Sequence, residues 1–196
     1  MDGAVFHRSR RLVFRHPDPS QAERVATQHG WASLGSRGGH RKAVELVWAV
    51  DDETTFHCVE DVASGEFCCF FRGSRIDGVT DAFRRIDAEV DAWSSAELID
   101  QVYAEAPPME RVGALFRLGL GAPAAFDDEF FDAFMVALRD EHPMIRAAAA
   151  RTAAYMEWPQ LLPELRIIAS GDTDARVRGE AEQVVSVFES AENGAQ

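Results

Sequence analysis

Apolar residues in the second half of the chain recur at intervals of three and four positions, the spacing of one buried face of an α-helix. Three segments carry this pattern, at Leu98, Ile99 and Val102; at Phe130, Phe131, Phe134, Met135 and Leu138; and at Leu161, Leu162, Leu165 and Ile168. A further helical segment follows each one, and the last buries Val177, Ala181 and Val184. The pattern predicts three helix pairs, with Pro163 bending or delaying the helix that contains it.

The first half of the chain has a different pattern, with short apolar runs bounded by turn residues. Such runs are typical of strands, and the turns between them favour an antiparallel meander. The predicted strands are 43–50, 54–61 and 65–73, preceded by a strand at 10–16, a helix at 18–30 and a glycine-rich basic loop at 33–41. A helix over 79–93 closes the unit. We therefore expect a small α+β domain in the order β-α-β-β-β-α.

A short motif recurs at the start of each second helix. Arg111, Arg146 and Arg178 are each followed by alanine three positions later, at spacings of 35 and 32 residues. The acidic residues six positions before these arginines are Glu105, Asp140 and Asp172. The residue three positions before each arginine is proline or alanine, and proline suits a first helical turn, where its missing N–H would have no partner. The motif indicates an internal repeat whose arginines reach acidic groups of their own or the adjacent repeat.

This motif resembles the short bacterial variants of HEAT repeats, which have the form D-x-D-x-x-V-R-x-x-A. The last repeat matches it position for position, at Asp172, Asp174, Val177, Arg178 and Ala181. The second repeat has His142 in place of the second aspartate, and the first keeps only the acidic residue, the arginine and the alanine. Asp174 and His142 are expected to cap their helices. The resemblance implies an α-solenoid with a protein-binding surface.

The expected fold class is thus α+β, with an N-terminal antiparallel sheet domain followed by an α-solenoid of about three HEAT-like helix pairs. The expected domains are 1–94 for the α+β domain and 95–190 for the helical repeats. A disordered tail is expected over 191–196. The first domain resembles no family that its residues identify.

Charge is distributed unevenly over the chain of 196 residues, whose net charge is −13. Residues 1–42 hold eight basic and three acidic side chains, whereas residues 97–196 hold eight basic and eighteen acidic ones. A nucleic-acid-binding surface needs basic side chains to neutralise phosphates, so binding to DNA or RNA is disfavoured. The charged N-terminus and the absence of a long apolar run favour a cytoplasmic protein without a membrane span.

Few residues suggest catalysis, and no known catalytic motif is present. His57, Cys58, Cys68 and Cys69 lie on neighbouring predicted strands, but strand alternation places consecutive residues on opposite faces, and no C-x-x-C pair offers zinc ligands. The cysteines are expected to pack as small hydrophobic residues. No metal or cofactor is expected. A further hypothesis places an anion on the basic loop at Arg37, His40 and Arg41.

The sequence favours a non-catalytic protein–protein interaction module, either a scaffold or adaptor or a specific inhibitor such as a toxin-immunity protein. The expected partner is a protein, and the acidic charge favours a basic one. Arg151, Tyr155 and Glu182 lie off the apolar stripes of the second helices and are candidate partner-binding residues. The alternative is an enzyme or anion-binding protein with a site between the two halves.

Overall fold

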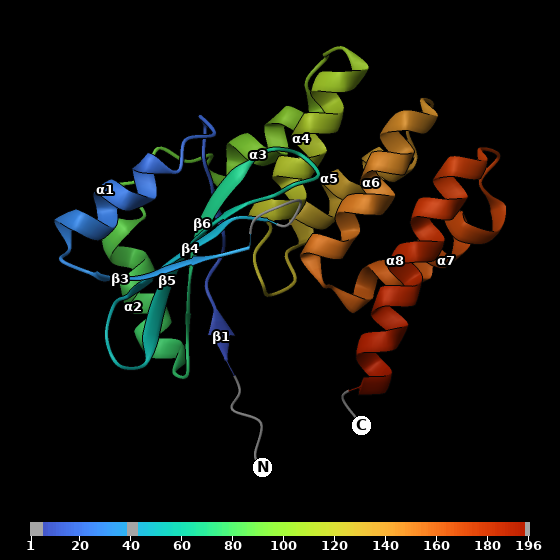
Figure 1. Cartoon of the computed structure of the whole chain (residues 1–196). Coiled ribbons are helices and arrows are strands. Elements are labelled where there is room, and N and C mark those ends of the chain that lie inside the picture. The colour runs from blue at the N-terminus through green and yellow to red at the C-terminus, as the bar shows by residue number, and fades with distance from the viewer. Residues whose placement is uncertain (1–5, 39–42, 195–196) are drawn as a thin grey trace. The chain divides into compact units, whose positions relative to one another are not determined.

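The computed structural model describes residues 6–38 and 43–194 of the chain. The chain divides into two compact units, residues 1–94 and residues 95–196. Figure 1 shows a sheet with helices in the first unit and paired helices in the second. Among the helices of the described residues, none is long and apolar enough to cross a bilayer.

The first unit is built on an antiparallel sheet. Its strands are β1 (His7–Arg8), β2 (Leu12–Val13), β3 (Ala32–Arg37), β4 (Glu45–Ala49), β5 (Thr54–Glu60) and β6 (Phe67–Gly73). The strand order is β1-β6-β5-β4-β3, and β2 also pairs with β6. The predicted meander of three strands is confirmed, because β4 pairs with β5 and β5 pairs with β6 in antiparallel register.

Helices α1 (Ser20–Gln28) and α2 (Ile76–Ile86) pack on one face of this sheet. Apolar side chains from both helices and from β4, β5 and β6 form a single buried cluster, in which Phe56, Phe71 and Ile86 are fully buried. Helix α1 ends as predicted before Gly30, whose φ of +68° belongs to the left-handed region that glycine adopts without strain. The sheet face that carries these apolar residues is thus covered by helices.

The prediction of a loop over 33–41 was wrong for its first part, because residues 32–37 form strand β3. This strand lies at the edge of the sheet, and all six of its residues are exposed. Its register shifts between Ser33 and Gly35, and Gly35 has a φ of +92°. An exposed edge strand that contains glycine has no apolar alternation, so its pairing could not be recognised from the side-chain pattern.

Two other elements of this unit differ from the prediction. The strand expected over 10–16 is reduced to β2 and an isolated bridge between Phe14 and Ala92, with β1 preceding it. The helix expected over 79–93 begins at Ile76 and ends at Ile86. Val90 still reaches the buried cluster from the segment after the helix, where the Trp93 N–H donates to the Val13 carbonyl oxygen. Val90 is buried although it lies beyond the end of the helix. Its apolar side chain therefore continued the helical period in the sequence past the point where the helix ends.

The three cysteines are buried and free of disulfide bonds. Cys58 lies opposite Cys69 in the β5–β6 register, and both belong to the buried cluster beneath the helices. Burial raises the pKa of the Cys68 thiol to about 11 and raises those of Cys58 and Cys69. The prediction that these residues pack as small hydrophobic side chains is confirmed.

Because the thiolate is the reactive form, the native protein should react very slowly with a thiol reagent at pH 8. We expect Ellman's reagent to modify no cysteine in native buffer within the time in which all three react in 6 M guanidinium. Stoichiometric release of nitrothiobenzoate from the native protein would contradict this prediction.

The second unit consists of helix pairs. Its helices are α3 (Ser95–Tyr103), α4 (Pro108–Gly121), α5 (Asp128–Leu138), α6 (Pro143–Met156), the short 3-10 helix η1 (Pro159–Leu161), α7 (Leu162–Gly171) and α8 (Ala175–Gly194). Helix α3 packs on α4, α5 on α6 and α7 on α8, and the second helices α4, α6 and α8 pack side by side (Figure 1). Helix α8 runs into the segment 191–196, for which a disordered tail was expected, and residues 195–196 lie outside the described part of the chain.

Several helices of this unit begin directly after a residue whose side chain accepts the free N–H groups of the first turn. Asp127 Oδ1 accepts the backbone N–H groups of Glu129 and Phe130, each at 3.1 Å. Asp174 Oδ1 accepts the N–H groups at the start of α8, and His142 Nδ1 accepts that of the second residue of α6 at 3.2 Å. Pro163 falls in the first turn of α7, so that helix starts after η1, as the proline predicted.

Candidate functional site

A groove runs across the second helices of the repeat unit. Its pocket has a volume of about 130 Å³ and is lined from three helices: by Met109, Val112 and Phe116 of α4, by Met144, Ala147, Ala148 and Arg151 of α6, and by Arg176 and Glu180 of α8. The lining residues of α6 follow the spacing i, i+3, i+4, i+7, and those of α8 are one turn apart. One face of each helix therefore contributes to the groove.

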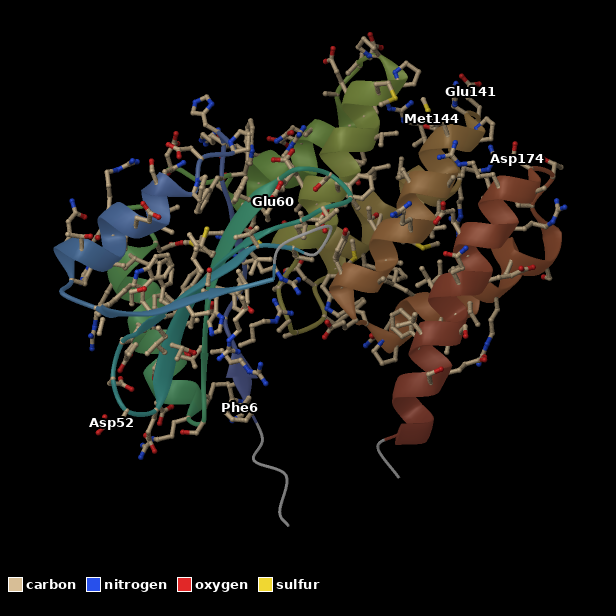
Figure 2. All side chains as sticks on the ribbon, in the orientation of Figure 1. Phe6, Asp52, Glu60, Glu141, Met144 and Asp174 are labelled. Atoms are coloured by element: carbon tan, nitrogen blue, oxygen red, sulfur yellow. The ribbon has the colours of Figure 1, made fainter. Side chains whose placement is uncertain are left out.

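The apolar part of the groove combines a small floor with long, adaptable side chains. Ala147 and Ala148 are buried and leave room between the helices. Met109 at the start of α4 is 68% exposed, and Met144 lies at the start of α6 (Figure 2). Methionine side chains are flexible and polarisable, and they adapt to partner surfaces of different shape. An exposed methionine beside an alanine floor is suited to receive an apolar side chain from another molecule.

Charged side chains border this apolar floor. Arg151 Nη1 lies 3.9 Å from Glu180 Oε1, and the side chains of Arg151 and Glu180 are 51% and 19% exposed. Arg176, one turn before Glu180, is exposed. An ion pair at this distance, with its arginine half exposed, adds little to stability. Its groups can therefore exchange one partner for another at small cost.

The three residues predicted to bind a partner have different positions. Arg151 lines the groove, and Tyr155, one turn later on α6, has its ring centroid 6.3 Å from that of Phe116. Glu182 is exposed on α8 but does not line the groove. It lies two positions after Glu180, so the two side chains point to nearly opposite sides of the helix. The sequence reasoning missed both Arg176 and Glu180 on α8, and their spacing of four positions could have indicated them.

The repeated arginines hold successive repeats together. Arg146 donates from Nε to Asp172 Oδ2 at 2.8 Å and from Nη2 to Asp172 Oδ1 at 2.9 Å, a two-bond pair with the next repeat. Its Nη1 donates to the carbonyl oxygens of Asp140 and Glu141 in its own repeat. Arg111 likewise pairs with the aspartate of the next repeat, because its Nη2 donates to Asp140 Oδ2. The predicted contacts with acidic groups are confirmed for Arg111 and Arg146.

Arg178 occupies the same position in the last repeat. Its Nη1 donates to the carbonyl oxygens of Asp172 at 2.7 Å and Thr173 at 3.3 Å, the residues that correspond to those contacted by Arg146. The motif thus has two roles, one in closing the turn between helices and one in joining neighbouring repeats.

These contacts change the acidity of the aspartates. Hydrogen bonds from Arg146, aided by the backbone N–H of Asp174, lower the pKa of Asp172 below its ordinary value in spite of its burial. For Asp140, burial acts to raise the pKa, but the hydrogen bonds from Arg111 and from the His142 N–H outweigh it and lower the pKa. Both carboxylates are charged at neutral pH. They belong to the scaffold of the unit, outside the groove.

The anion site suggested for the first unit is described in part. Arg37 is exposed at the end of β3. His40 and Arg41 lie outside the described residues, so the expected grouping of the three is not tested. Within the described residues, no three His, Cys, Asp or Glu side chains gather as a metal site requires.

A polar cluster on β4 and β5 was not predicted as a unit. His57 Nδ1 lies 2.7 Å from Glu45 Oε1, and His57 Nε2 lies 2.7 Å from Thr55 Oγ1. The imidazole ring stacks on Phe70 at 5.0 Å, opposite it in the β5–β6 register. Burial lowers the pKa of His57, Glu45 opposes this effect, and the charges of Arg72 and Arg37 lower the pKa further. Since Glu45 and His57 are twelve positions apart, only the strand register brings them together.

Comparison with known proteins identifies the second unit alone. Residues 95–186 match the family model for HEAT repeats, and the match does not extend into residues 1–94. Searches of curated proteins and of solved structures found no significant match. HEAT repeats commonly mediate protein–protein interaction and are typically non-catalytic scaffolds. The paired helices, the arginine contacts between repeats and the family match agree, and residues 95–186 form a HEAT-repeat region.

Proposed function

We propose that the chain is a protein-binding module whose HEAT-repeat region receives an apolar segment of a partner protein in the groove of α4, α6 and α8. The observation that carries this proposal is the combination of an exposed methionine, an alanine floor and a charged border on aligned helix faces. An amphipathic helix binds such a surface by placing its apolar side chains in the groove and its polar ones at the border.

The groove also suggests how a partner segment would be oriented. Arg151 and Arg176 can bind acidic or carbonyl groups, whereas Glu180 can bind a basic group. The Arg151–Glu180 pair has to open for either residue to bind a partner, and a pair at 3.9 Å with a half-exposed arginine opens at small cost. We expect a bound segment to carry apolar residues toward Met109 and Met144 and at least one charged residue toward α8.

The net charge bears on the choice of partner at longer range. Residues 97–196 hold eight basic and eighteen acidic side chains, so their field favours approach of a basic protein. The groove and the acidic charge are sufficient for a scaffold or adaptor to bind a partner protein. The narrower hypothesis of an inhibitor that neutralises a basic toxin, as an immunity protein does, rests on the charge alone.

The groove can be tested by affinity capture with exposed substitutions. We expect Met109→Asp and Arg176→Glu, each introduced into the full chain as bait, to reduce the amount of the main protein captured from a lysate of the source organism at least tenfold. Removal of a well-packed contact at the centre of an interface costs about 2 kcal/mol or more, which supports this magnitude.

Ile167→Asp is the matched control, because Ile167 is an apolar residue of α7 that is 63% exposed and lies outside the groove lining. Its capture should equal that of the unmodified chain. Equal capture by all four baits would contradict the assignment of the groove. Capture that is indifferent to salt between 50 and 300 mM would contradict the electrostatic part of the proposal.

A further inference from the structure

A second cavity lies in the first unit, on the face of the sheet opposite to α1 and α2. Its volume is about 330 Å³, large enough for a small metabolite. Arg37 of β3 and Arg72 of β6 line it together with Asp51, Asp52 and Glu53 of the turn between β4 and β5. Figure 2 shows Phe6 and Asp52, both of which line the cavity, at the same end of the sheet. Cations and anions thus border a single space.

These opposite charges do not neutralise one another. Among the described residues, no ion pair joins Arg37 or Arg72 to any carboxylate, although acidic side chains outnumber basic ones in the chain by thirty-three to twenty. The Arg72 guanidinium lies over the Phe6 ring, with 4.6 Å between Cζ and the ring centroid. Asp51 Oδ1 accepts the Glu53 N–H at 2.8 Å, which fixes the acidic turn. The cavity therefore holds exposed positive and negative groups that, within the described residues, form no ion pair with each other.

The floor of the cavity is polar and ordered by hydrogen bonds. Thr55 and His57, two positions apart on β5, both line it. Thr55 Oγ1 has two acceptors within reach, His57 Nε2 at 2.7 Å and the Arg72 carbonyl oxygen at 3.1 Å. The other ring nitrogen, His57 Nδ1, is hydrogen-bonded to Glu45 Oε1 at 2.7 Å. The hydroxyl and the imidazole are thus kept in place without a ligand, which lowers the entropy cost of binding one.

We propose that this cavity binds a small zwitterion, with its carboxylate or phosphate on Arg37 and Arg72 and its ammonium group on the acidic turn 51–53. Guanidinium groups bind oxyanions through charge-assisted hydrogen bonds, and carboxylates bind ammonium groups in the same manner. A ligand with one charge would satisfy only one side of the cavity and would meet like charge on the other. A zwitterion satisfies both, and Thr55 supplies a hydroxyl between them.

The proposal can be tested by NMR titration of the ¹⁵N-labelled full chain at pH 7 and constant ionic strength. The probes are glycine, β-alanine, 4-aminobutyrate and phosphoethanolamine, and each is compared with analogues that carry charge of one sign only: acetate, propionate, butyrate, ethyl phosphate and ethylamine. We expect at least one zwitterion to bind about tenfold more tightly than either of its halves, with shifts centred on the amides of Thr55, His57 and Arg72. The carboxylate and phosphate probes separate the two sources of oxyanion.

Exposed substitutions assign the two ends of the ligand. Arg72→Ala and Asp52→Asn should each weaken binding of the zwitterion about tenfold, whereas the matched controls Arg85→Ala and Asp77→Asn, on exposed residues of α2, should leave it unchanged. Arg72→Ala should also abolish the weak binding of the anionic half. Equal affinity for a zwitterion and its halves, equal affinity of all variants, or no shift with any probe at 20 mM would overturn the proposal.

Discussion

Asp172→Ala should unfold the HEAT-repeat region at markedly lower denaturant concentration, with a loss of about 2–3 kcal/mol at pH 7. The substitution removes the two hydrogen bonds that Asp172 accepts from Arg146. It also leaves the Arg146 guanidinium, only 14% exposed, without its carboxylate. Chemical denaturation followed by helical circular dichroism measures the effect.

The contact of Arg166 with Glu189 provides a matched control. Its nitrogen–oxygen distance is also 2.8 Å, but its side chains are 54% and 46% exposed. Glu189→Ala should change the free energy of unfolding by no more than about 0.5 kcal/mol. A similar loss in both variants would show that the Arg146 contact has no special weight in joining the repeats.

The contribution of Asp172 should depend on pH in a defined direction. Its pKa is lowered in the folded protein, so the carboxylate stabilises the fold above its unfolded pKa of about 4, and this stabilisation is lost as the pH falls through the folded pKa. The neutral variant Asp172→Asn lacks this titration. The stability difference between Asp172→Asn and the unmodified chain should therefore narrow between pH 7 and pH 3, and a constant difference would contradict the assignment.

Gly119→Ala should destabilise the same region by about 1–2 kcal/mol, although alanine favours helices more than glycine does. Gly119 lies where α4 meets α6, and a Cβ atom there would lie 2.9 Å from the Thr152 carbonyl oxygen and 3.2 Å from the Tyr155 ring. Because the closest atom belongs to the backbone of α6, relief requires the two helices to separate. Thermal unfolding measures the loss.

Gly179→Ala is the matched control for this prediction. Gly179 lies within α8, and a Cβ atom at its position would meet no atom within 4 Å. The substitution should raise the stability by about 0.5–1 kcal/mol, because it reduces the freedom of the unfolded chain. The two substitutions are chemically identical, and opposite signs are expected. A gain at both positions would show that α4 and α6 can move apart without cost.

The repeat half of the fold could be predicted because its determinants are local in sequence. Each helix pair shows its own apolar period, and each arginine occupies a fixed position relative to its helix start. The groove could be predicted only in part. Arg151 was found because it lies off the apolar stripe, but Met109 and Met144 are apolar, and nothing in the period distinguishes an exposed apolar residue from a buried one.

The sheet half was predictable where side chains alternate and unpredictable where only the backbone pairs. Strands β4, β5 and β6 have one face in the buried cluster, and their bounds were found closely. The charged cavity depends on side chains from β3, β5, β6 and a turn, and the register of an edge strand brings Arg37 into it. Gly35 interrupts the alternation of side chains along β3, so the register of this strand could not be predicted from the sequence pattern.

The pairing of β1 and β2 with β6 has a consequence for synthesis. His7 lies opposite Gly73 and Leu12 lies opposite Cys69, so β1 and β2 pair with the strand of the sheet that is synthesised last, about sixty residues later in the chain. Until then the backbone groups of β1 and β2 remain unpaired while the nascent chain lengthens. Pairing between strands so distant in sequence forms slowly. The helix pairs that follow close on neighbours a few residues away. A chaperone that protects nascent strands should therefore act on β1 and β2 and release them only after β6 has emerged.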